Sequence, residues 1–533
     1  MTGSPEVSTK SNGTTDPLTT EHPGLYLFVD DYWIAEQEGL SRLLNRPEVL
    51  PEPIIWPDKP QVEQDCAWGN VLREPDGRIR LWYTTMRMGH EGRGGHAMAA
   101  AGVWGRGNDF SFYPRSEDDR PVVEHMLGRY AESRDGLHWV KPELGLIEFR
   151  GSRRNNIVLN GTLASQQTDG ALTNADGFTV VRDDEESDPT KRYKLIAHWE
   201  SIHYWDNHSV SGALGRPEEV MKKYHEARGK YITFSPDGIL WNQPLVRLQV
   251  PSFGDRCLVT RNHRHQYWWL NNRPNAANGY GAAGLQTSKD LINWSPIEAI
   301  LPRTEDNPDH PDIESLIPFN YGNQDLAFLI TQVKRENDSK LLSFIASHHD
   351  GEDWKRVSMV PTEPFIPPGP KGSYYSNGAV VLQNEPLIIG EELLIYFNAF
   401  ALRDEPQSRF GRRSIGVAKL RRDAFAGLTA GNEQAEHRSG RLVTRPLKVS
   451  SPNLYLNIEQ RGAGGAAKVA LRHADQRPIP GFGPQEALPI TQDGVRHQVS
   501  WKNRADIGAL LGQDVVIEME LTGPAILYAI VFE

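Results

Sequence analysis

The chain has 533 residues, of which 38% are hydrophobic and 24% charged, an ordinary composition for a globular protein rather than a disordered or fibrous one. The formal net charge of −11 argues against non-specific binding to nucleic acid, which requires basic patches, and no apolar run approaches the roughly 20 residues of a membrane span. The length indicates more than one domain. We therefore expect neither a nucleic-acid nor a membrane partner.

Residues 1–24 are rich in Ser, Thr, Gly and Pro and contain no apolar stretch, so we expect a flexible tail rather than a secretory signal. Two cysteines, Cys66 and Cys257, are too few for a disulfide framework. A cytoplasmic location is the simplest interpretation. A chain from which a signal had been removed would look the same.

A short motif recurs along the chain and indicates repeated units. In its first copy, Ser133-Arg-Asp135-Gly136-Leu-His-Trp139, an Asp-Gly turn is followed by a Trp that can pack back on a sheet. Further copies are Ser235-Pro-Asp237-Gly238-Ile-Leu-Trp241, Ser288-Lys-Asp290-Leu-Ile-Asn-Trp294, Asp350-Gly351-Glu-Asp-Trp354 and a degraded Asp423-Ala424-Phe425. A β-sandwich would not repeat one turn five times in register.

Each unit also contains two earlier strand-like segments. They cover residues 68–72 and 79–84, 177–181 and 193–198, 257–260 and 266–270, 315–319 and 326–332, and 378–382 and 392–397. With the strands before and after the turn, this gives about four strands per unit, as in a propeller blade. The pattern predicts a five-bladed β-propeller over residues 25–428, with insertions at 86–127 and 199–229 and a short helix at 217–227.

After a small, polar stretch at 429–439, the pattern changes. Strand-like segments at 454–458, 467–471, 515–521 and 526–532 alternate with polar turns. They predict a β-sandwich over residues 440–533 and an all-β fold class for the whole chain.

Acidic residues stand at the start of the innermost strand of several units, where a propeller would bring them to one central funnel. These are Asp65, Asp176 and Asp255 in the first three units and Asp312 and Glu314 in the fourth, with Glu63 as a rival to Asp65. An Asp before a strand is often only a turn cap, but four at equivalent positions favour a shared site. Clustered carboxylates have pKa values that are pushed apart, as glycoside hydrolysis requires of its proton donor and its nucleophile or base.

Other candidates for substrate binding are Arg256, Trp68, Trp199 and Trp205. Arg256 can bind a sugar or pair with its neighbours, and the tryptophans can stack on a sugar or serve as core, the second being the more frequent role of propeller aromatics. Cys66 and Cys257 adjoin the site, and small buried residues are the simpler interpretation of both. No metal ligands and no cofactor are predicted.

Four phrases resemble a group of bacterial five-bladed propeller proteins that are described as similar to glycoside hydrolase families 32 and 43. They are Tyr130-Ala-Glu-Ser-Arg-Asp-Gly-Leu-His-Trp139, Arg192-Tyr-Lys-Leu195, Ile415-Gly-Val-Ala-Lys-Leu-Arg-Arg-Asp-Ala-Phe425 and Gly440-Arg-Leu-Val-Thr-Arg-Pro-Leu447. The resemblance implies that Asp65 is the nucleophile or base, Asp176 the transition-state stabiliser and Asp255 the acid. The chain departs from those families because it lacks the Trp-Met-Asn-Asp-Pro-Asn-Gly, Arg-Asp-Pro and Glu-Cys motifs, and an Asp replaces the expected Glu acid. Glu314 therefore remains a rival acid.

These features predict a glycoside hydrolase that is exo-acting on a furanoside or a related glycan. One alternative is a non-catalytic carbohydrate-binding propeller, which would keep an aromatic rim but need no proton donor. Another is an assembly protein that forms a homo-oligomer through the 86–127 insertion.

Overall fold

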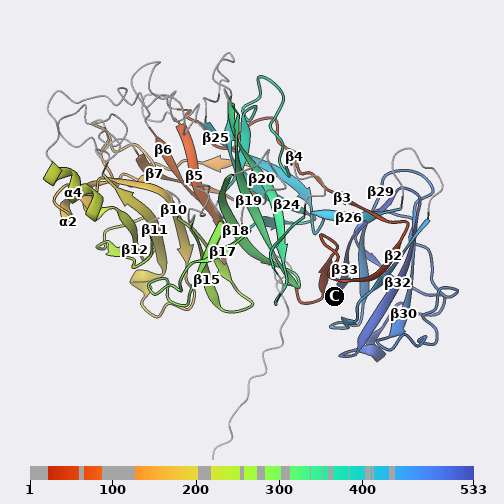
Figure 1. The fold of residues 1–533 in the computed structure, drawn as a ribbon. Coiled ribbons are helices and arrows are strands. Elements are labelled where there is room, and N and C mark those ends of the chain that lie inside the picture. Colours follow the sequence, from red (N-terminus) through yellow and green to blue (C-terminus); the bar gives the residue numbers. More distant parts are fainter. Residues whose placement is uncertain are drawn as a thin grey trace, which may run out of the picture.

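The computed structural model describes residues 22–58, 65–86, 126–149, 151–201, 218–251, 257–272, 283–301, 312–335, 338–351, 353–357, 364–382, 384–401, 410, 413–430 and 439–533. Within these ranges the fold is all-β, as predicted, with short helices α2 (Thr162–Gln167) and α4 (Glu218–Ala227). No helix among the described residues is both long and apolar enough to cross a membrane. Figure 1 shows a larger body of sheets beside a smaller one formed mainly by the C-terminal strands.

The larger body repeats one antiparallel strand order, and we call each repeat a unit. The first unit contains β5 (Asp65–Arg73), β6 (Ile79–Met86), β7 (Met126–Ser133) and β8 (Trp139–Val140), with β9 (Ile157–Leu159) beside β7. The second contains β10 (Asn174–Arg182), β11 (Tyr193–Glu200), β12 (Gly229–Ser235) and β13 (Val246–Arg247), and the third β14 (Leu258–Asn262), β15 (Tyr267–Asn272), β16 (Ala283–Ser288) and β17 (Glu298–Ile300). The strands predicted for these units lie within these bounds or within a residue of them.

The fourth and fifth units share one sheet. The fourth contains β18 (Asp312–Tyr321), β19 (Gln324–Arg335), β20 (Asp338–His348) and β21 (Lys355–Arg356); the fifth contains β22 (Gly378–Val381), β23 (Leu387–Ile389), β24 (Glu392–Phe400) and β25 (Arg413–Arg421). A parallel bridge from Leu341 to Gly378 joins them. The last strand of the fifth unit is β4 (Glu48–Val49), which precedes the first unit in the chain. Sequence analysis did not identify this strand.

Hydrogen bonds link each unit to the next. Asn70 exchanges bonds of 2.7 and 2.9 Å with the backbone of Val180, and the Cys257 N–H donates to Gly177 O at 2.8 Å. The Thr260 hydroxyl donates to Pro318 O at 2.7 Å, the Ser343 hydroxyl to Ala379 O at 2.8 Å, and the Trp68 N–H to Asn398 Oδ1 at 2.5 Å. The last of these bonds returns from the first unit to the fifth. The contacts therefore run once around all the units.

The repeated turn has the predicted internal structure. In the first unit the backbone N–H groups of Leu137 and His138 donate to Asp135 Oδ1 at 2.9 and 2.8 Å. The indole N–H of Trp139 donates to Gly136 O at 3.0 Å, so the ring packs back as expected. In the third unit Leu291 replaces the glycine and still adopts a positive φ of 65°.

The first, second and fifth copies of the turn also form a hydrogen bond with the preceding unit. Gly136 O accepts from Tyr396 of the fifth unit at 3.0 Å, and Gly238 O accepts from Trp82 of the first at 2.6 Å. The degraded fifth copy behaves alike, because Asp423 Oδ1 accepts from Tyr321 of the fourth unit at 2.7 Å. The motif found by sequence thus holds neighbouring units together.

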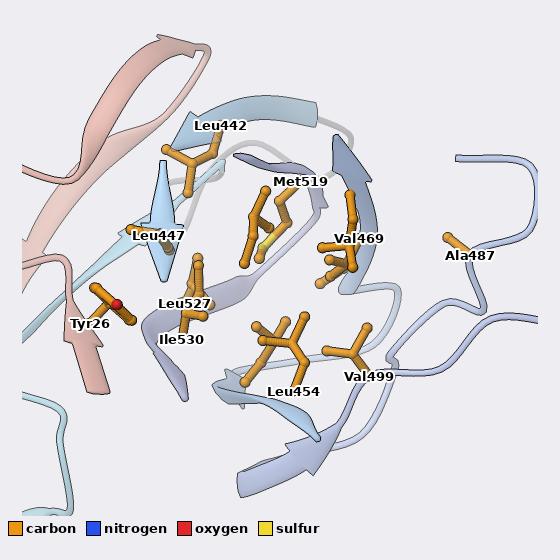
Figure 2. Close-up of a cluster of buried hydrophobic side chains, with 14 of the residues drawn as sticks. Tyr26, Leu442, Leu447, Leu454, Val469, Ala487, Val499, Met519, Leu527 and Ile530 are labelled. Carbon is orange, nitrogen blue, oxygen red and sulfur yellow. The ribbon is translucent and has the colours of Figure 1, made fainter. Parts of the chain in front are cut away.

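The smaller body consists of two antiparallel sheets around one apolar core. One contains β1 (Leu25–Leu27), β3 (Ser41–Leu44), β26 (Ala426–Thr429), β29 (Leu454–Gln460), β31 (Gly494–Gln498) and β33 (Ala525–Phe532). The other contains β2 (Ile34–Glu38), β27 (Ser439–Thr444), β28 (Leu447–Lys448), β30 (Ala466–His473) and β32 (Asp514–Thr522). Figure 2 shows Leu454, Leu527 and Ile530 pointing toward Val469 and Met519 across this core.

The N-terminal strands differ from the predicted division of the chain. Residues 25–44 were expected within 25–428, yet β1 pairs with β33, β2 with β27 and β3 with β26, so these strands contribute to the sheets of the smaller body. The physical reason is that a β-strand takes its place from its pairing partner, which here lies about 400 residues further along the chain, as in the pair Leu25 and Val531.

The two bodies are joined by apolar and polar contacts. Both faces of β33 are buried: Leu527 and Ile530 belong to the core of Figure 2, while Ala529 and Val531 pack with the fourth and fifth units. The guanidinium of Arg496 also donates to the buried carboxylate of Asp423 at 2.6 Å. The joint is therefore a continuous packed interface.

Candidate active site

The first strands of the units begin at the edge where the predicted acids lie. Asp65 and Asp312 are the first residues of β5 and β18, while Asp176 and Glu314 are the third residues of β10 and β18. The first strands of the first four units lie side by side in chain order, β5 next to β10, β10 next to β14 and β14 next to β18. Asp255, Arg256 and Trp205 lie outside the described residues.

A β-bulge lies next to or at these acids in three of the units. The register shifts between Ala67 and Gly69 in β5, between Asp176 and Thr179 in β10, and between Ile313 and Ser315 in β18. Bulges redirect side chains and are frequent beside active sites. The glycines within β5 and β10 are the one sequence signal that could have indicated them, because glycine inside a strand often marks a bulge.

The bulge of the first unit places Trp68 in a strained conformation. Its φ is +43°, which is exceptional for a bulky residue, and its N–H is held by Asn398. The half-buried ring lies 6.2 Å from that of Phe400, and the Arg413 guanidinium lies 6.0 Å from the Trp68 ring. Sequence analysis proposed Trp68 for substrate binding, but it missed Arg413.

Trp199 has a different environment. It is 1% exposed and packs in the apolar core between the first and second units, together with Phe178 and Leu195. This is the core alternative that sequence analysis considered the more frequent one for a propeller tryptophan.

Asp176 lies on a charged and buried face of the second sheet. The strand register places it directly opposite His198, and His198 directly opposite Lys230. Asp176 is 7% exposed, while the side chains of His198 and Lys230 have no solvent exposure. We call Asp176, His198 and Lys230 the second-sheet row; sequence analysis recognised only its aspartate.

Glu200 and Arg228 lie beside this row. The Arg228 Nε–H lies 3.0 Å from His198 Nε2 and 3.2 Å from Glu200 Oε2. Glu200 Oε2 also lies 3.5 Å from His198 Nε2, so the imidazole lies between a guanidinium and a carboxylate. Burial, together with the charges of Lys230 and Arg228, lowers the pKa of His198 despite the opposing effect of Glu200.

The first sheet contributes another buried cation. Arg129 is 1% exposed and donates to Thr85 Oγ1 at 2.7 Å and to Asn156 Oδ1 at 2.9 Å. It lies in the strand row of Tyr83, beside the bulge at Gly69. The described residues of the first and second units thus include a buried carboxylate, buried cations and the half-buried ring of Trp68.

One group of side chains in the described part of the chain has the spacing of a metal site, but it lies elsewhere. The ligand atoms of Asp325, His348 and Asp350 are within 4.8 Å of one another. Asp325 Oδ1 already accepts from Asn320 at 2.7 Å and lies 3.3 Å from the guanidinium of Arg264. We assign this group to the docking of the fourth repeated turn on the third unit.

No family model matches the chain, and no curated protein matches it. Among solved structures, the chain is similar to an N-acetylgalactosamine deacetylase from F. plautii, with 14% identity, coverage of 73% of this chain and 97% of that one, and a TM-score of 0.41. It is similar to a beta-1,2-mannobiose phosphorylase from Listeria innocua (12% identity, 71% and 97% coverage, TM-score 0.43) and to a family 32 beta-fructofuranosidase from Bombyx mori (10%, 90% and 93%, 0.40). At these scores the likeness by itself identifies neither the activity nor the substrate.

Proposed function

We propose that the chain is a glycoside hydrolase built as a five-bladed propeller with a C-terminal β-sandwich. The observation that carries the proposal is the row of neighbouring first strands β5, β10, β14 and β18, with acidic residues at the starting ends of β5, β10 and β18. Asp65, Asp176, Asp312 and Glu314 share this position in the first, second and fourth units. Carboxylates gathered in this way can divide the roles of proton donor and nucleophile or base.

The proposed roles follow the order of the units. Asp65 acts as nucleophile or general base, Asp176 stabilises the transition state, and either Asp255 or Glu314 donates the proton to the leaving group. A retaining mechanism requires the two catalytic carboxyl groups about 5–5.5 Å apart, and an inverting one about 6.5–9.5 Å, to leave room for water.

The substrate proposed is a carbohydrate, taken from its chain end as a furanoside or a related glycan. Trp68 supplies a ring for stacking on a sugar face, and its strained backbone and contact with Arg413 hold that ring in place. Asp312, Arg256 and Trp205 are proposed to bind sugar hydroxyls or sugar faces around it. The proposed oligomer contact, at 86–127, lies almost entirely outside the described residues, and the cytoplasmic location stays a prediction.

The test is hydrolysis of a panel of aryl and natural glycosides, including furanosides, by the wild type and by Asp65→Asn and Asp176→Asn. We expect each variant to lose at least about a thousandfold in kcat while retaining a cooperative thermal transition. Asp237→Asn is the matched control, because that carboxylate lies in the repeated turn of the same unit as Asp176 and should leave kcat unchanged.

The alternative function, a non-catalytic carbohydrate-binding propeller, predicts a different result. Wild-type protein would then bind glycans from the same panel, measured calorimetrically, without hydrolysing any of them. Hydrolysis that survives in both Asp variants would instead place the reaction at another site.

A further inference from the structure

The fifth unit places a buried asparagine at the end of its sheet where β18 starts. The strand register forms one row across the fourth and fifth units, in which each residue lies opposite the next: Asp312, Gln332, Leu341, Gly378 and Phe400. Asn377 directly precedes Gly378, the first residue of β22, and its N–H donates to Phe400 O at 2.8 Å. Asn377 therefore stands at the start of the fifth unit's first strand, at the same sheet end as Asp312.

Aromatic side chains of two units meet beside Asn377. The ring of Phe400 lies 6.2 Å from that of Trp68, and both belong to a small cluster of the first, fourth and fifth units, together with Ile330, Leu341 and Val380. Phe400 is buried, whereas Trp68 is only half-buried. A sugar that stacks on the Trp68 ring directs hydroxyls outward from its edge, so a polar group beside this cluster is placed to bind one of them.

Three buried asparagines in the described part of the fifth unit differ in what their side-chain oxygens bind. Asn384 Oδ1 accepts from the Val71 N–H at 3.1 Å and Asn398 Oδ1 from the Trp68 N–H at 2.5 Å, so both fasten the fifth unit to β5. Asn377 is 9% exposed, and its Oδ1 is buried without a hydrogen-bond partner among the described residues. Leaving a buried acceptor unpaired destabilises a fold, and native proteins complete nearly all such bonds.

We propose that Asn377 is a substrate-binding residue, whose Oδ1 accepts a hydrogen bond from a hydroxyl of the sugar that stacks on Trp68. A carboxamide oxygen requires a donor, and the hydroxyl groups are the donors that every glycan offers. The inference rests on the proposed function for the position of the sugar at Trp68. It does not depend on whether that sugar is hydrolysed.

The first measurement is calorimetric binding of the glycosides of the panel and of free arabinose, fructose, mannose and galactose to Asp65→Asn protein, in which hydrolysis should be blocked. Adding Asn377→Ala should weaken binding about five- to tenfold, the effect of one neutral hydrogen bond. Asn377→Asp keeps an accepting oxygen and should restore most of the affinity. Unchanged affinity in Asn377→Ala would overturn the proposal, as would a folded protein that binds no sugar of this set.

The matched control is Asn384→Ala. Asn384 is 6% exposed and lies just beyond the other end of β22, where its amide group also donates to Glu385 O at 2.7 Å. Its oxygen is already bonded within the protein, so its replacement should leave the affinity for sugars within about twofold. A loss of affinity equal to that of Asn377→Ala would show that the effect comes from a loosened fifth unit and not from a lost contact with the sugar.

The second measurement is thermal unfolding, which requires no ligand. Asn377→Ala removes an oxygen that forms no bond within the described structure, so the Tm should stay within about 2 °C of the wild type. Asn384→Ala leaves the buried Val71 N–H without its acceptor and should lower the Tm by about 3–6 °C. Equal losses in the two variants would assign Asn377 a structural role and contradict the proposal.

The combined results separate this inference from the proposed function. Sugar binding that weakens in Asn377→Ala, together with a complete absence of hydrolysis by the wild type, would support the role of Asn377 and reject the glycosidase. Hydrolysis with an unchanged KM in Asn377→Ala would support the glycosidase and reject the role of Asn377.

Discussion

The two bodies of the molecule treat buried charge in opposite ways. Every charged side chain that is buried in the described part of the chain, including Arg129, Lys230 and Glu200, lies before residue 431, whereas the described C-terminal range 439–533 buries none. The core cluster of the smaller body contains no charged side chain, and its side-chain polar groups are the hydroxyl of Tyr26 and the indole N–H of Trp501, which donates to Val469 O. Burying a charge costs free energy that apolar packing does not.

The difference indicates which part of the fold keeps buried charges that stability alone does not require. A buried ion pair can often be replaced by apolar residues without loss of stability, so its presence in the larger body indicates a requirement other than stability. Part of that requirement is docking, as with Asp423 and Arg496. Other buried charges pair away from the proposed site, as Arg80 and Glu74 do. Asp176, His198 and Lys230 lie instead at the starting end of the second unit's first strand, where the site is proposed.

The largest effect on the free energy of unfolding is expected in the core of the smaller body. Leu527→Ala removes a fully buried side chain from the core of Figure 2 and should lower the free energy of unfolding of the smaller body by about 3–4 kcal/mol. The kcat of the folded protein should stay within about twofold. Calorimetry with parallel activity measurements checks both values. A fall in kcat as large as that of Asp176→Asn would show that the two bodies are not separable in function.

The next effect concerns the docking of the first repeated turn. Gly136 has a φ of +78°, and an added Cβ would lie 2.5 Å from the hydroxyl of Tyr396 and 2.7 Å from Leu394 Cδ1. Gly136→Ala should therefore destabilise the larger body by about 2–3 kcal/mol, since strain and overpacking add. Gly77 has a similar φ of +81° with open space around it, so Gly77→Ala should cost only about 1 kcal/mol. Equal losses would mean that the turn does not carry the contact between the first and fifth units.

The carboxylate of Asp30, at the joint between the two bodies, should make the free energy of unfolding depend on pH. Burial alone would raise the pKa of Asp30, but hydrogen bonds from His349, Ser347 and the Tyr32 N–H lower it to about 2. The unfolded value is about 3.9, so this carboxylate stabilises the fold above about pH 4 and the contribution is lost as the pH falls toward 2. The wild type should lose about 2 kcal/mol over this range relative to Asp30→Asn. Unfolding curves recorded from pH 5 to pH 2 test this, and parallel curves for the two proteins would exclude the effect.

The smallest effect is expected at the surface of the smaller body. Arg441 forms ion pairs of 2.9 Å with Glu36 and 2.7 Å with Glu518 while remaining 45% exposed. Exposed pairs contribute little, so Arg441→Met should change the free energy of unfolding by no more than about 0.5–1 kcal/mol. Denaturant unfolding measures this, and a loss near that of Leu527→Ala would assign the stability of the smaller body to its ion pairs rather than to its core.

The sequence was sufficient for the elements that carry a local signal. The repeated turns were found because Asp135 and its equivalents must bind backbone N–H groups at a fixed spacing, which leaves a recognisable motif. The alternation of apolar residues likewise located most strands of the units. Long-range pairing has no such signal: β4 has two residues, and its place in the fifth unit depends on Ala418 and Lys419, far along the chain.

The second-sheet row was missed for a related reason. In β11, Tyr193, Leu195, Ala197 and Trp199 form one apolar face, so Lys194, His198 and Glu200 look like the solvent-exposed face of a half-buried strand. Both faces are in fact buried, because the second sheet packs between its neighbours. Which polar residues of a strand become part of a site was therefore decided by packing between units, which periodicity within one strand does not reveal.

The pairing of the N-terminal strands β1 to β4 has a consequence for biosynthesis. The partners of β1 to β4 are β33, β27, β26 and β25, all of which leave the ribosome after the other units have been made. The N-terminal segment must therefore remain unpaired during most of translation, with its strand edges open to association with other chains. Closing so many long-range pairs at the end also predicts slow final folding, so a nascent chain of this protein would depend on chaperones more than the short, local contacts within each unit suggest.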